Sequence, residues 1–306
     1  MTGSRLSAVF SAPRMAYFYA ALPPLFWSGN FLIARVMRDD IPPIQMSFSR
    51  WGLAFVILLP FAAARFRGQG AQIRTELPFL LLLGAVGITA FNCFIYAALH
   101  YTTVVNASLI NTMMPVMTFL LALALLSERL RGVQVGGVLV AFGGAVLIIA
   151  KGDIGELASL VPDRGALLVI AGVTFWSLYT VLIRWRPTKL PPLAFLAVTV
   201  GLGAVFHLPL VAWELWRLGG FGLTAETGAS ILYFAVFPSV LAYIIWNKAV
   251  ATIGPGRAGM YMYLMPVFGS ALGVWLLGEA FRFYHLAGIV LIFVGIALVN
   301  RGARAP

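Results

Sequence analysis

The chain has 306 residues, of which 61% are hydrophobic and only 10% charged, and its mean hydropathy is +0.95. A soluble domain carries about 25% charged residues, so this composition excludes a water-soluble globule, and it excludes a disordered chain as well. The net charge of +11 comes from basic residues spread thinly between apolar runs. That pattern indicates membrane topology rather than a nucleic acid partner.

Ten apolar segments follow one another along the chain, each with the roughly 20 residues that a helix needs to cross a bilayer. They are apolar on every face, whereas the strands of a membrane barrel alternate apolar and polar residues. We therefore predict an all-α integral membrane protein with ten transmembrane helices. Their expected bounds are 15–36, 44–64, 77–99, 103–126, 132–150, 164–184, 192–216, 228–250, 256–277 and 283–300.

The basic residues indicate which way the chain is threaded. If the N-terminus is cytoplasmic, about two thirds of the 21 basic residues fall on the cytoplasmic side, as the positive-inside rule requires. We expect both termini in the cytoplasm and a multi-pass location in a bacterial inner membrane. In this scheme Arg50 lies near the outer membrane boundary, and Lys248 and Arg257 lie near cytoplasmic helix ends.

The chain repeats itself at an offset near 150 residues. Phe26-Trp27-Ser28 recurs as Phe175-Trp176-Ser177 at an offset of 149. Matches at an offset of 151 are Ala107 with Ala258, Pro115 with Pro266, Glu128 with Glu279, Gly137 with Gly288 and Gly144 with Gly295. Each half then holds five helices, and because five is odd the halves must lie in opposite orientations. Such inverted repeats are typical of secondary transporters; a duplicated scaffold without a pathway is the alternative.

In both halves a stretch of small residues precedes a proline, a glutamate follows 13 residues later, and the last helix carries glycines. With this pattern the chain resembles, over residues 15–301, the EamA-type branch of the drug/metabolite transporter superfamily. Within it, the chain is most similar to the YddG-type bacterial exporters of aromatic amino acids. The resemblance implies two five-helix repeats around a central cavity formed by helices of both repeats.

The predicted helices leave too few residues for a separate soluble domain. We divide the chain into an N-terminal cytoplasmic tail, a first repeat, a periplasmic connector, a second repeat and a C-terminal cytoplasmic tail. Their bounds are 1–14, 15–150, 151–163, 164–301 and 302–306. Small residues such as Gly136, Gly137, Gly143 and Gly144 are expected to permit close helix packing.

Polar and aromatic residues at depth are candidates for the cavity wall, because polar groups are costly in lipid and face the bundle interior. Aromatic walls with a few amide and hydroxyl groups suit a planar or amphipathic organic solute and suit a bare ion badly. The alternative for any one of these residues is that it only joins helices or packs in the core. The predicted substrate-binding residues are Trp27, Asn30, Asn92, Tyr96, Asn111, Trp176, Tyr179, Tyr243, Trp246 and Met265.

Two prolines and two glutamates occupy matching places in the repeats. Pro115 and Pro266 each remove a backbone hydrogen bond and kink the helix, which predicts a role in gating or shape. Glu128 and Glu279 end the fourth and ninth predicted helices. We expect a structural role, either capping or pairing with the nearby Arg129, Arg131 or Arg282 at the interface, rather than coupling of transport to protons.

The remaining motifs argue against other classes of protein. The sequence has no Walker loop, its three histidines lack metal-ligand spacing, and Cys93 is its only cysteine, so we expect no enzyme, cofactor or metal. No acidic residue lies well inside a predicted helix, and His207, the titratable group that does, is expected to be packed and hydrogen-bonded. Facilitated export is therefore simpler than a carboxylate proton relay.

Together these features predict a secondary transporter that works as a monomer in the lipid bilayer. It would export aromatic or other amphipathic amino acids and related metabolites by alternating access through a central cavity. The alternatives are another small solute, such as a small polar amino acid, a nucleobase or a cationic drug, or a channel. A channel would need a ring of charges or carbonyls.

Overall fold

The computed structural model describes residues 13–98, 101–102, 104–129, 131–153, 155, 163–278 and 280–301. All regular structure in these ranges is helical. The predicted tail 302–306, most of the tail 1–14, most of the connector 151–163, and Glu279 lie outside them.

Nine helical stretches in the described residues are long and apolar enough to cross a membrane. They are Pro43–Phe66, Gly70–Ala98, Asn106–Leu126, Gly132–Ile149, Arg164–Trp185, Pro192–Leu218, Ala225–Ile253, Pro255–Leu276 and Phe283–Arg301. They match nine of the ten predicted helices, with ends shifted by a few residues.

The first predicted helix, at 15–36, is interrupted. It consists of α2 (Pro13–Tyr19) and α3 (Leu22–Val36), and neither reaches the 18 residues required of a single spanning helix. Pro23 and Pro24 lie in the first turn of α3. Because proline has no backbone N–H, these residues cannot donate the hydrogen bonds that would continue α2 into α3.

Several of the other spans are also composite. The third runs from α5 through the π-helical η1 into α6, and the eighth from α13 through the π-helical η2 into α14. Their bounds are Gly70–Leu83, Gly84–Ala90 and Phe91–Ala98, then Ala225–Phe234, Ala235–Leu241 and Ala242–Ile253. Both π-helical segments have seven residues, and η2 begins 151 residues after η1. The halves therefore carry the same backbone irregularity at the same place.

The fourth and ninth spans are broken in the middle. The fourth comprises α7 (Val104–Asn111) and α8 (Met114–Leu126). The ninth comprises α15 (Pro255–Met260), the 3-10 turn η3 (Tyr261–Tyr263) and α16 (Leu264–Leu277). The remaining helices are continuous: α4 (Pro43–Phe66), α9 (Gly132–Ile149), α11 (Arg164–Trp185), α12 (Pro192–Leu218) and α17 (Phe283–Arg301).

Pro115 and Pro266 begin new helical segments instead of kinking continuous ones, which corrects the expected geometry. Pro115 is the second residue of α8 and Pro266 the third residue of α16. The N–H groups in the first turn of a helix have no acceptor within that helix, so proline, which has no backbone N–H, is accepted there. The chain consequently breaks just before each proline. The gating role of the two prolines stays a prediction.

Glycines hold the last helices of the two halves in backbone contact, as expected for Gly137 and Gly144 but not for Gly136 and Gly143, where a Cβ atom would meet nothing within 4 Å. A Cβ atom on Gly137 would lie 2.8 Å from the carbonyl oxygen of Gly295, and one on Gly144 would lie 2.7 Å from that of Gly288. Because the earlier glycine of α9 meets the later glycine of α17, the two helices run antiparallel. Any larger side chain at these positions would force them apart.

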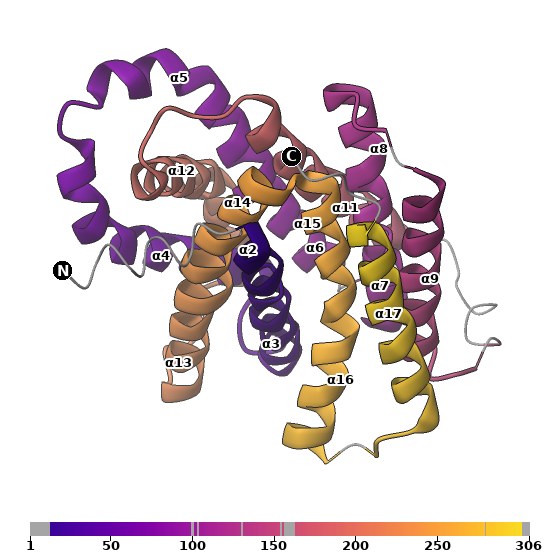
Figure 1. Ribbon diagram of the computed structural model, residues 1–306. Coiled ribbons are helices and arrows are strands. Elements are labelled where there is room, and N and C mark those ends of the chain that lie inside the picture. Colours follow the sequence, from indigo (N-terminus) through magenta and orange to yellow (C-terminus); the bar gives the residue numbers. More distant parts are fainter. Residues whose placement is uncertain are drawn as a thin grey trace, which may run out of the picture.

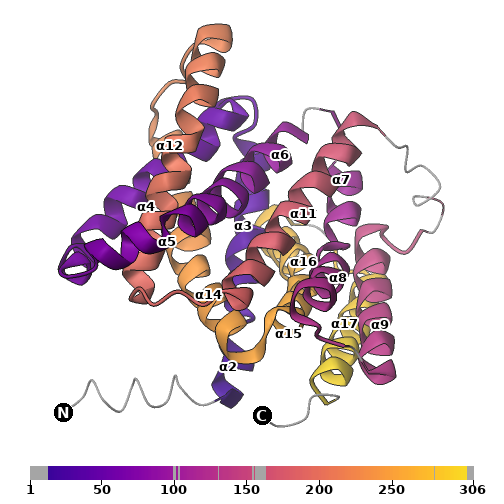
Figure 2. The same cartoon turned by 90° about the horizontal axis from the view of Figure 1, so that it is seen from above.

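The helices are arranged in a central group with a flank on either side (Figure 1). Seen from above, α4, α5 and α12 lie on one flank and α9 and α17 on the other (Figure 2). Between them stand α3, α8, α11, α14, α15 and α16. The central group brings together helices from both halves of the chain, and it surrounds the site described next.

Candidate functional site

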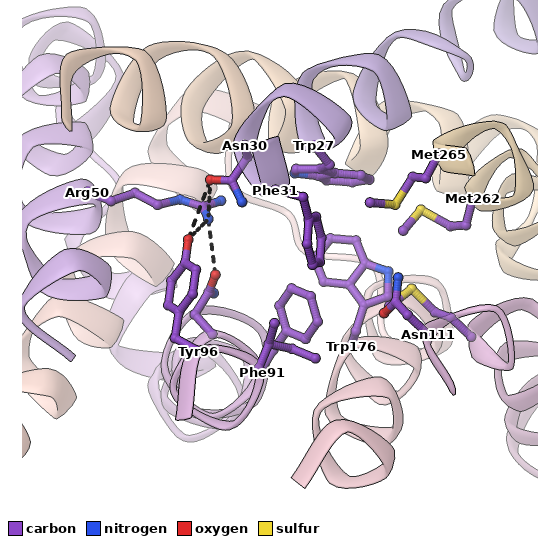
Figure 3. Close-up of a pocket in the computed structure, with 13 residues that line it drawn as sticks. Trp27, Asn30, Phe31, Arg50, Phe91, Tyr96, Asn111, Trp176, Met262 and Met265 are labelled. Carbon is purple, nitrogen blue, oxygen red and sulfur yellow. Dashed lines mark hydrogen bonds between the residues drawn. The ribbon is translucent and has the colours of Figure 1, made fainter. Parts of the chain in front are cut away.

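A cavity lies between the two halves of the chain. It contains about 420 Å³ of space not filled by atoms, part of it open to the surroundings. Its walls come from α3, α4, α6, α7 and α8 of the first half, and from α11, η3 and α16 of the second (Figure 3). The lining residues are Trp27, Asn30, Phe31, Arg50, Phe91, Asn92, Ile95, Tyr96, Asn111, Met114, Trp176, Met262 and Met265.

The structure brings seven of the ten predicted substrate-binding residues to this cavity. They are Trp27, Asn30, Asn92, Tyr96, Asn111, Trp176 and Met265. Six of them have the polar or aromatic side chain that sequence reasoning used, and the seventh, Met265, directly precedes Pro266. That these seven residues bind substrate stays a prediction.

The other three predicted residues, Tyr179, Tyr243 and Trp246, do not line the cavity and are fully buried. They pack behind Trp27 and Trp176. The ring centroid of Trp246 lies 5.4 Å from that of Trp27 and 5.6 Å from that of Trp176, and Tyr243 lies 5.4 Å from Trp176. These three rings therefore support the wall instead of forming it. The repeat pattern located their helices, but helical spacing alone does not say how deep in the packing a ring lies.

The two indoles of the wall differ in their hydrogen bonding. Trp27 donates its Nε1–H to the carbonyl oxygen of Pro238 at 2.9 Å. The Nε1 atom of Trp176 is buried and has no partner among the described residues. Gly87, which precedes Pro238 by 151 residues, has a carbonyl oxygen that instead accepts a hydrogen bond from the Tyr243 hydroxyl at 2.8 Å. The Nε1–H of Trp176 therefore lies beside the cavity without an acceptor among the described residues.

A matching pair of hydrogen bonds ties the broken helices to the helices that carry the indoles. Ser28 on α3 donates its hydroxyl hydrogen to the carbonyl oxygen of Met265 at 3.0 Å. Ser177 on α11 donates to the carbonyl oxygen of Met114 at 3.2 Å. Each serine directly follows a tryptophan of the wall, so the breaks before α8 and α16 are held against the cavity in the same way.

Arg50 also lines the cavity, and sequence reasoning did not include it in the site. Its side chain is only 3% exposed. The guanidinium donates from Nε to the hydroxyl of Ser239 at 2.6 Å and from Nη2 to the carbonyl oxygen of Pro238 at 3.1 Å. Its Nη1 donates to the amide oxygen of Asn92 and to the hydroxyl of Tyr96, both at 3.2 Å. Nη1 also donates to the amide oxygen of Asn30 at 3.5 Å, so Arg50 holds three residues that were predicted to bind substrate.

The expectation that Arg50 lies near a membrane boundary stays a prediction. The residue lies seven positions after Pro43, the first residue of α4, and its side chain turns into the interior. Its place near the start of an apolar segment did not indicate that it lines the cavity. Ser47 and Arg50, three positions apart on α4, were the available signal, because that spacing places both on one helical face.

His207 is packed and hydrogen-bonded, as expected. Its Nε2 atom lies 2.8 Å from the hydroxyl of Ser47, and its Nδ1 atom lies 2.8 Å from the carbonyl oxygen of Gly203. The side chain is fully buried. Both ring nitrogens are occupied, so His207 joins α4 to α12 and does not line the cavity.

Two glutamates are buried near helix ends, away from the cavity. Glu214 accepts hydrogen bonds from the backbone N–H groups of Ile44 (3.2 Å) and Gln45 (2.8 Å), at the start of α4. Glu76 accepts hydrogen bonds from the Thr188 hydroxyl and the Lys189 N–H. Both carboxylates serve as caps and crosslinks between helices, and neither is among the described residues that line the cavity.

Glu128 interacts with arginines of the other half. Burial raises the pKa of Glu128, and the positive charges of Arg184 and Arg257 partly oppose that rise. The carboxylate lies close to Gly254, at the turn between α14 and α15. The expected pairing with arginines adjacent in sequence is therefore replaced by electrostatic contact across the repeat boundary, because the turn after α8 faces the second half.

The sequence matches the model of the EamA-like transporter family twice, over residues 14–150 and over residues 163–301. The chain belongs to the EamA-like transporter family. The two matched segments cover nearly the whole chain, and each contains the wall indole, the broken helix and the glycine-bearing final helix of its half. An EamA-like transporter is a multi-pass membrane protein that moves small molecules across the bilayer.

Relatives agree with this family. The chain is 27% identical over 282 residues to the "Uncharacterized transporter YyaM" of Bacillus subtilis (strain 168), covering 92% of each chain. It is also 27% identical over 297 residues to the "Probable amino-acid metabolite efflux pump" of Salmonella typhimurium (strain LT2), covering 94% of this chain and 95% of that protein. A solved crystal structure, 21% identical, superposes with a TM-score of 0.79 over 96% of this chain and 100% of the other, so the two chains share a fold.

Proposed function

We propose that the protein exports aromatic or other amphipathic amino acids and related metabolites across a bacterial inner membrane. The observation that carries this proposal is the cavity between the halves, whose wall combines indole and phenyl rings with amide, hydroxyl and guanidinium groups. Rings bind the flat or apolar part of a solute by stacking and burial, and the polar groups orient its other part. A bare ion would leave the rings without a role.

The architecture of the proposal is ten membrane helices in two inverted five-helix repeats, at 15–150 and 164–301. Here α2 and α3 together make the first crossing. The antiparallel contact of α9 and α17, the matched π-helical segments and the paired serine hydrogen bonds all support a pseudo-two-fold axis in the membrane plane. With an even number of crossings, both termini lie on one side, and the basic residues favour the cytoplasm.

Alternating access would move the repeats about the central cavity. The broken helices before Pro115 and Pro266 are the natural places for this movement, because a break lets the two segments tilt separately. None of the described residues that line the cavity carries a carboxylate. This lining favours facilitated export down a solute gradient over proton coupling. We further propose that a single chain carries out the export.

The test is uptake into liposomes that contain the purified protein. Labelled phenylalanine and tryptophan should enter saturably, should be displaced by other aromatic amino acids, and should enter equally well with and without a proton gradient. Linear uptake that never saturates would indicate a channel. No uptake above empty liposomes, with the protein shown to be folded, would overturn the aromatic assignment.

A pair of variants connects uptake to the cavity. Trp176→Ala removes a ring from the wall, while Trp216→Ala removes a tryptophan that is 81% exposed. Loss of the wall ring should slow uptake about tenfold, since a tenfold change corresponds to about 1.4 kcal/mol and a lost aromatic contact costs about that much. Equal uptake by the two variants would place the transport pathway elsewhere.

A further inference from the structure

We propose that Arg50 binds the carboxylate of the transported solute, so that the cavity selects molecules with an anionic group at one end. This inference rests on the proposed function, and it names the chemical class of the substrate. It predicts that the carboxylate decides recognition, and that neutral or cationic analogues of the same size are rejected.

The guanidinium of Arg50 is a buried charge with no charged partner among the residues that the structure describes. The hydrogen-bond acceptors that these residues offer it are neutral oxygens: the hydroxyls of Ser239 and Tyr96, the amide oxygens of Asn30 and Asn92, and the carbonyl oxygen of Pro238. Among the described residues, the one ion pair within 4.0 Å joins Arg38 to Asp39, and both of these side chains are exposed. The positive charge beside the cavity is therefore solvated by dipoles but not neutralised.

A buried arginine without an opposite charge is costly, because the guanidinium has lost its water. Burying a charge is accepted when an opposite charge and good hydrogen bonds offset the desolvation. The described residues give the Arg50 guanidinium hydrogen bonds but no opposite charge. A carboxylate arriving with the substrate supplies what is missing.

The guanidinium also has donor capacity left. It carries five N–H groups, one on Nε and two on each terminal nitrogen. Nη2 donates one hydrogen bond among the described residues, to the carbonyl oxygen of Pro238. Its second N–H is available for a ligand. Arginine matches the planar geometry of a carboxylate, with charge-assisted hydrogen bonds that are about twice as strong as neutral ones.

The layout of the cavity suits a molecule with one charged end. Arg50, Asn30 and Tyr96 gather at one end, while Asn111, Met262 and Met265 lie at the other (Figure 3). Rings stand between the two ends, among them Phe31, Phe91 and Trp176. An amino acid would then place its carboxylate on Arg50, its ammonium near the neutral oxygens around it, and its side chain among the rings and thioethers.

Two further atoms mark the other end of the cavity as partly polar. The amide oxygen of Asn111 and the indole Nε1 of Trp176 are buried without a hydrogen-bond partner among the described residues. Buried polar atoms are normally paired, and leaving one unpaired destabilises the protein. A hydroxyl on the far end of the solute would satisfy both, because it can donate to the amide oxygen of Asn111 and accept from the Nε1–H of Trp176. The charge requirement at Arg50 does not depend on this second contact.

The first experiment changes the ligand and keeps the protein intact. The thermal stabilisation of the purified full-length protein in detergent is titrated with L-phenylalanine, L-phenylalaninamide, phenethylamine and 3-phenylpropionate. The two carboxylates should bind within a few-fold of each other. The amide and the amine, which keep the ring and lose the anion, should bind at least about tenfold more weakly. Equal binding of L-phenylalanine and its amide would overturn the inference.

The second experiment changes the protein. Arg50→Gln should abolish the difference between L-phenylalanine and L-phenylalaninamide, and Arg50→Lys should keep part of it because the charge remains. The matched control is Arg217→Gln, which removes an equal charge from an exposed arginine of α12 and should preserve the difference. A retained preference for the acid in a folded Arg50→Gln protein would contradict the inference. If that variant does not fold, the ligand series on the intact protein decides alone.

Failure of the inference and failure of the proposed function give different results. If aromatic amino acids do not bind, but an aliphatic carboxylate such as 4-methylpentanoate stabilises the protein through Arg50, the aromatic assignment falls and the anion site stands. If aromatic amino acids are transported and their amides are transported equally well, the function stands and the anion site falls. If no carboxylate stabilises the protein, both fall.

Discussion

Arg50 and Thr199 occupy matching places in the two halves, each seven residues after the proline that begins α4 or α12. Arg50 reaches across the molecule to Ser239 in η2 of the other half. The hydroxyl of Thr199 instead donates back to carbonyl groups of its own preceding turn, at 3.0 Å. One position therefore carries the charge of the cavity, while its counterpart only stabilises its own helix.

The broken helices differ in the same way. Asn111 and Met114 of the first half correspond to Met262 and Met265 of the second, at an offset of 151, and all four line the cavity. The first half contributes a charge and several amide or hydroxyl groups to the wall, and the second contributes an indole and two thioethers. The difference teaches that the backbone keeps the symmetry of the repeat while the side chains of the wall do not, as the proposed amino-acid substrate, which has two unlike ends, requires.

The largest effect is expected where the symmetry is strict. Gly144 on α9 and Gly295 on α17 are equivalent residues, and each would place a Cβ within 2.7 Å of the facing helix. Gly144→Val and Gly295→Val should lower the free energy of unfolding by similar amounts, about 2 kcal/mol or more, since overpacking forces the backbones apart. Thermal unfolding in detergent measures both.

Gly143→Val serves as the control for these glycines. A Cβ at Gly143 meets nothing within 4 Å, so the same substitution one residue away should leave the unfolding temperature nearly unchanged. A tolerated valine at Gly144, or a large difference between Gly144 and Gly295, would contradict the symmetric packing of α9 and α17.

An intermediate effect is expected where the backbone is symmetric and the hydrogen bonds are not. Trp27→Phe and Trp176→Phe remove the same ring atoms and the same N–H. Only Trp27 loses a hydrogen bond within the protein, that to the carbonyl oxygen of Pro238. Trp27→Phe should therefore be the less stable variant by about 1 kcal/mol in ligand-free protein. Equal unfolding temperatures would show that the N–H of Trp176 is also paired.

The smallest effect concerns pH and Glu128. Burial raises the pKa of this carboxyl above its usual value of 4.5, so the protonated form is favoured in the folded protein. Stability is then greatest below pH 4.5 and falls as the pH rises through the higher pKa of the folded state. Glu128→Gln should remove this part of the pH dependence and unfold at a slightly higher temperature at pH 7.

Thermal unfolding of wild type and Glu128→Gln between pH 4 and pH 8 checks the sign. A wild-type protein that gains stability over the variant as the pH rises would mean that Arg184 and Arg257 outweigh burial at this carboxyl. The change is small because the side chain is only partly buried and solvent screens its charge.

Most of the fold was predictable from the sequence, because helices in lipid must be long and apolar and must satisfy their own backbone. Nine of the ten predicted helices are present, and the first fails as a single helix only at the prolines Pro23 and Pro24. The wall residues Trp27 and Trp176 were predictable from the repeat. The positions of the helix breaks were not predictable, since a proline within an apolar segment is compatible both with a kink in one helix and with the start of a new helix.

The predicted and the observed site residues differ in how deeply their side chains are packed behind the cavity wall. Tyr243 and Trp246 have the same residue types and spacing as true wall residues, yet they lie behind Trp176. Arg50 looks like a boundary residue in sequence, yet it lines the cavity. Whether a side chain reaches open space depends on neighbouring helices far away in the chain, and a local pattern carries no information about them.

The sequence by itself determined that the chain is embedded in a membrane, that it consists of two related halves, and that indoles and amides lie at depth. These properties follow from composition and periodicity, which act on each segment separately. Only the tertiary structure decided that Arg50 is buried without a countercharge and that the polar groups gather at one end of the cavity. The physical reason is that desolvation and hydrogen bonding depend on which helices meet, and η2 meets α4 across 189 residues of sequence.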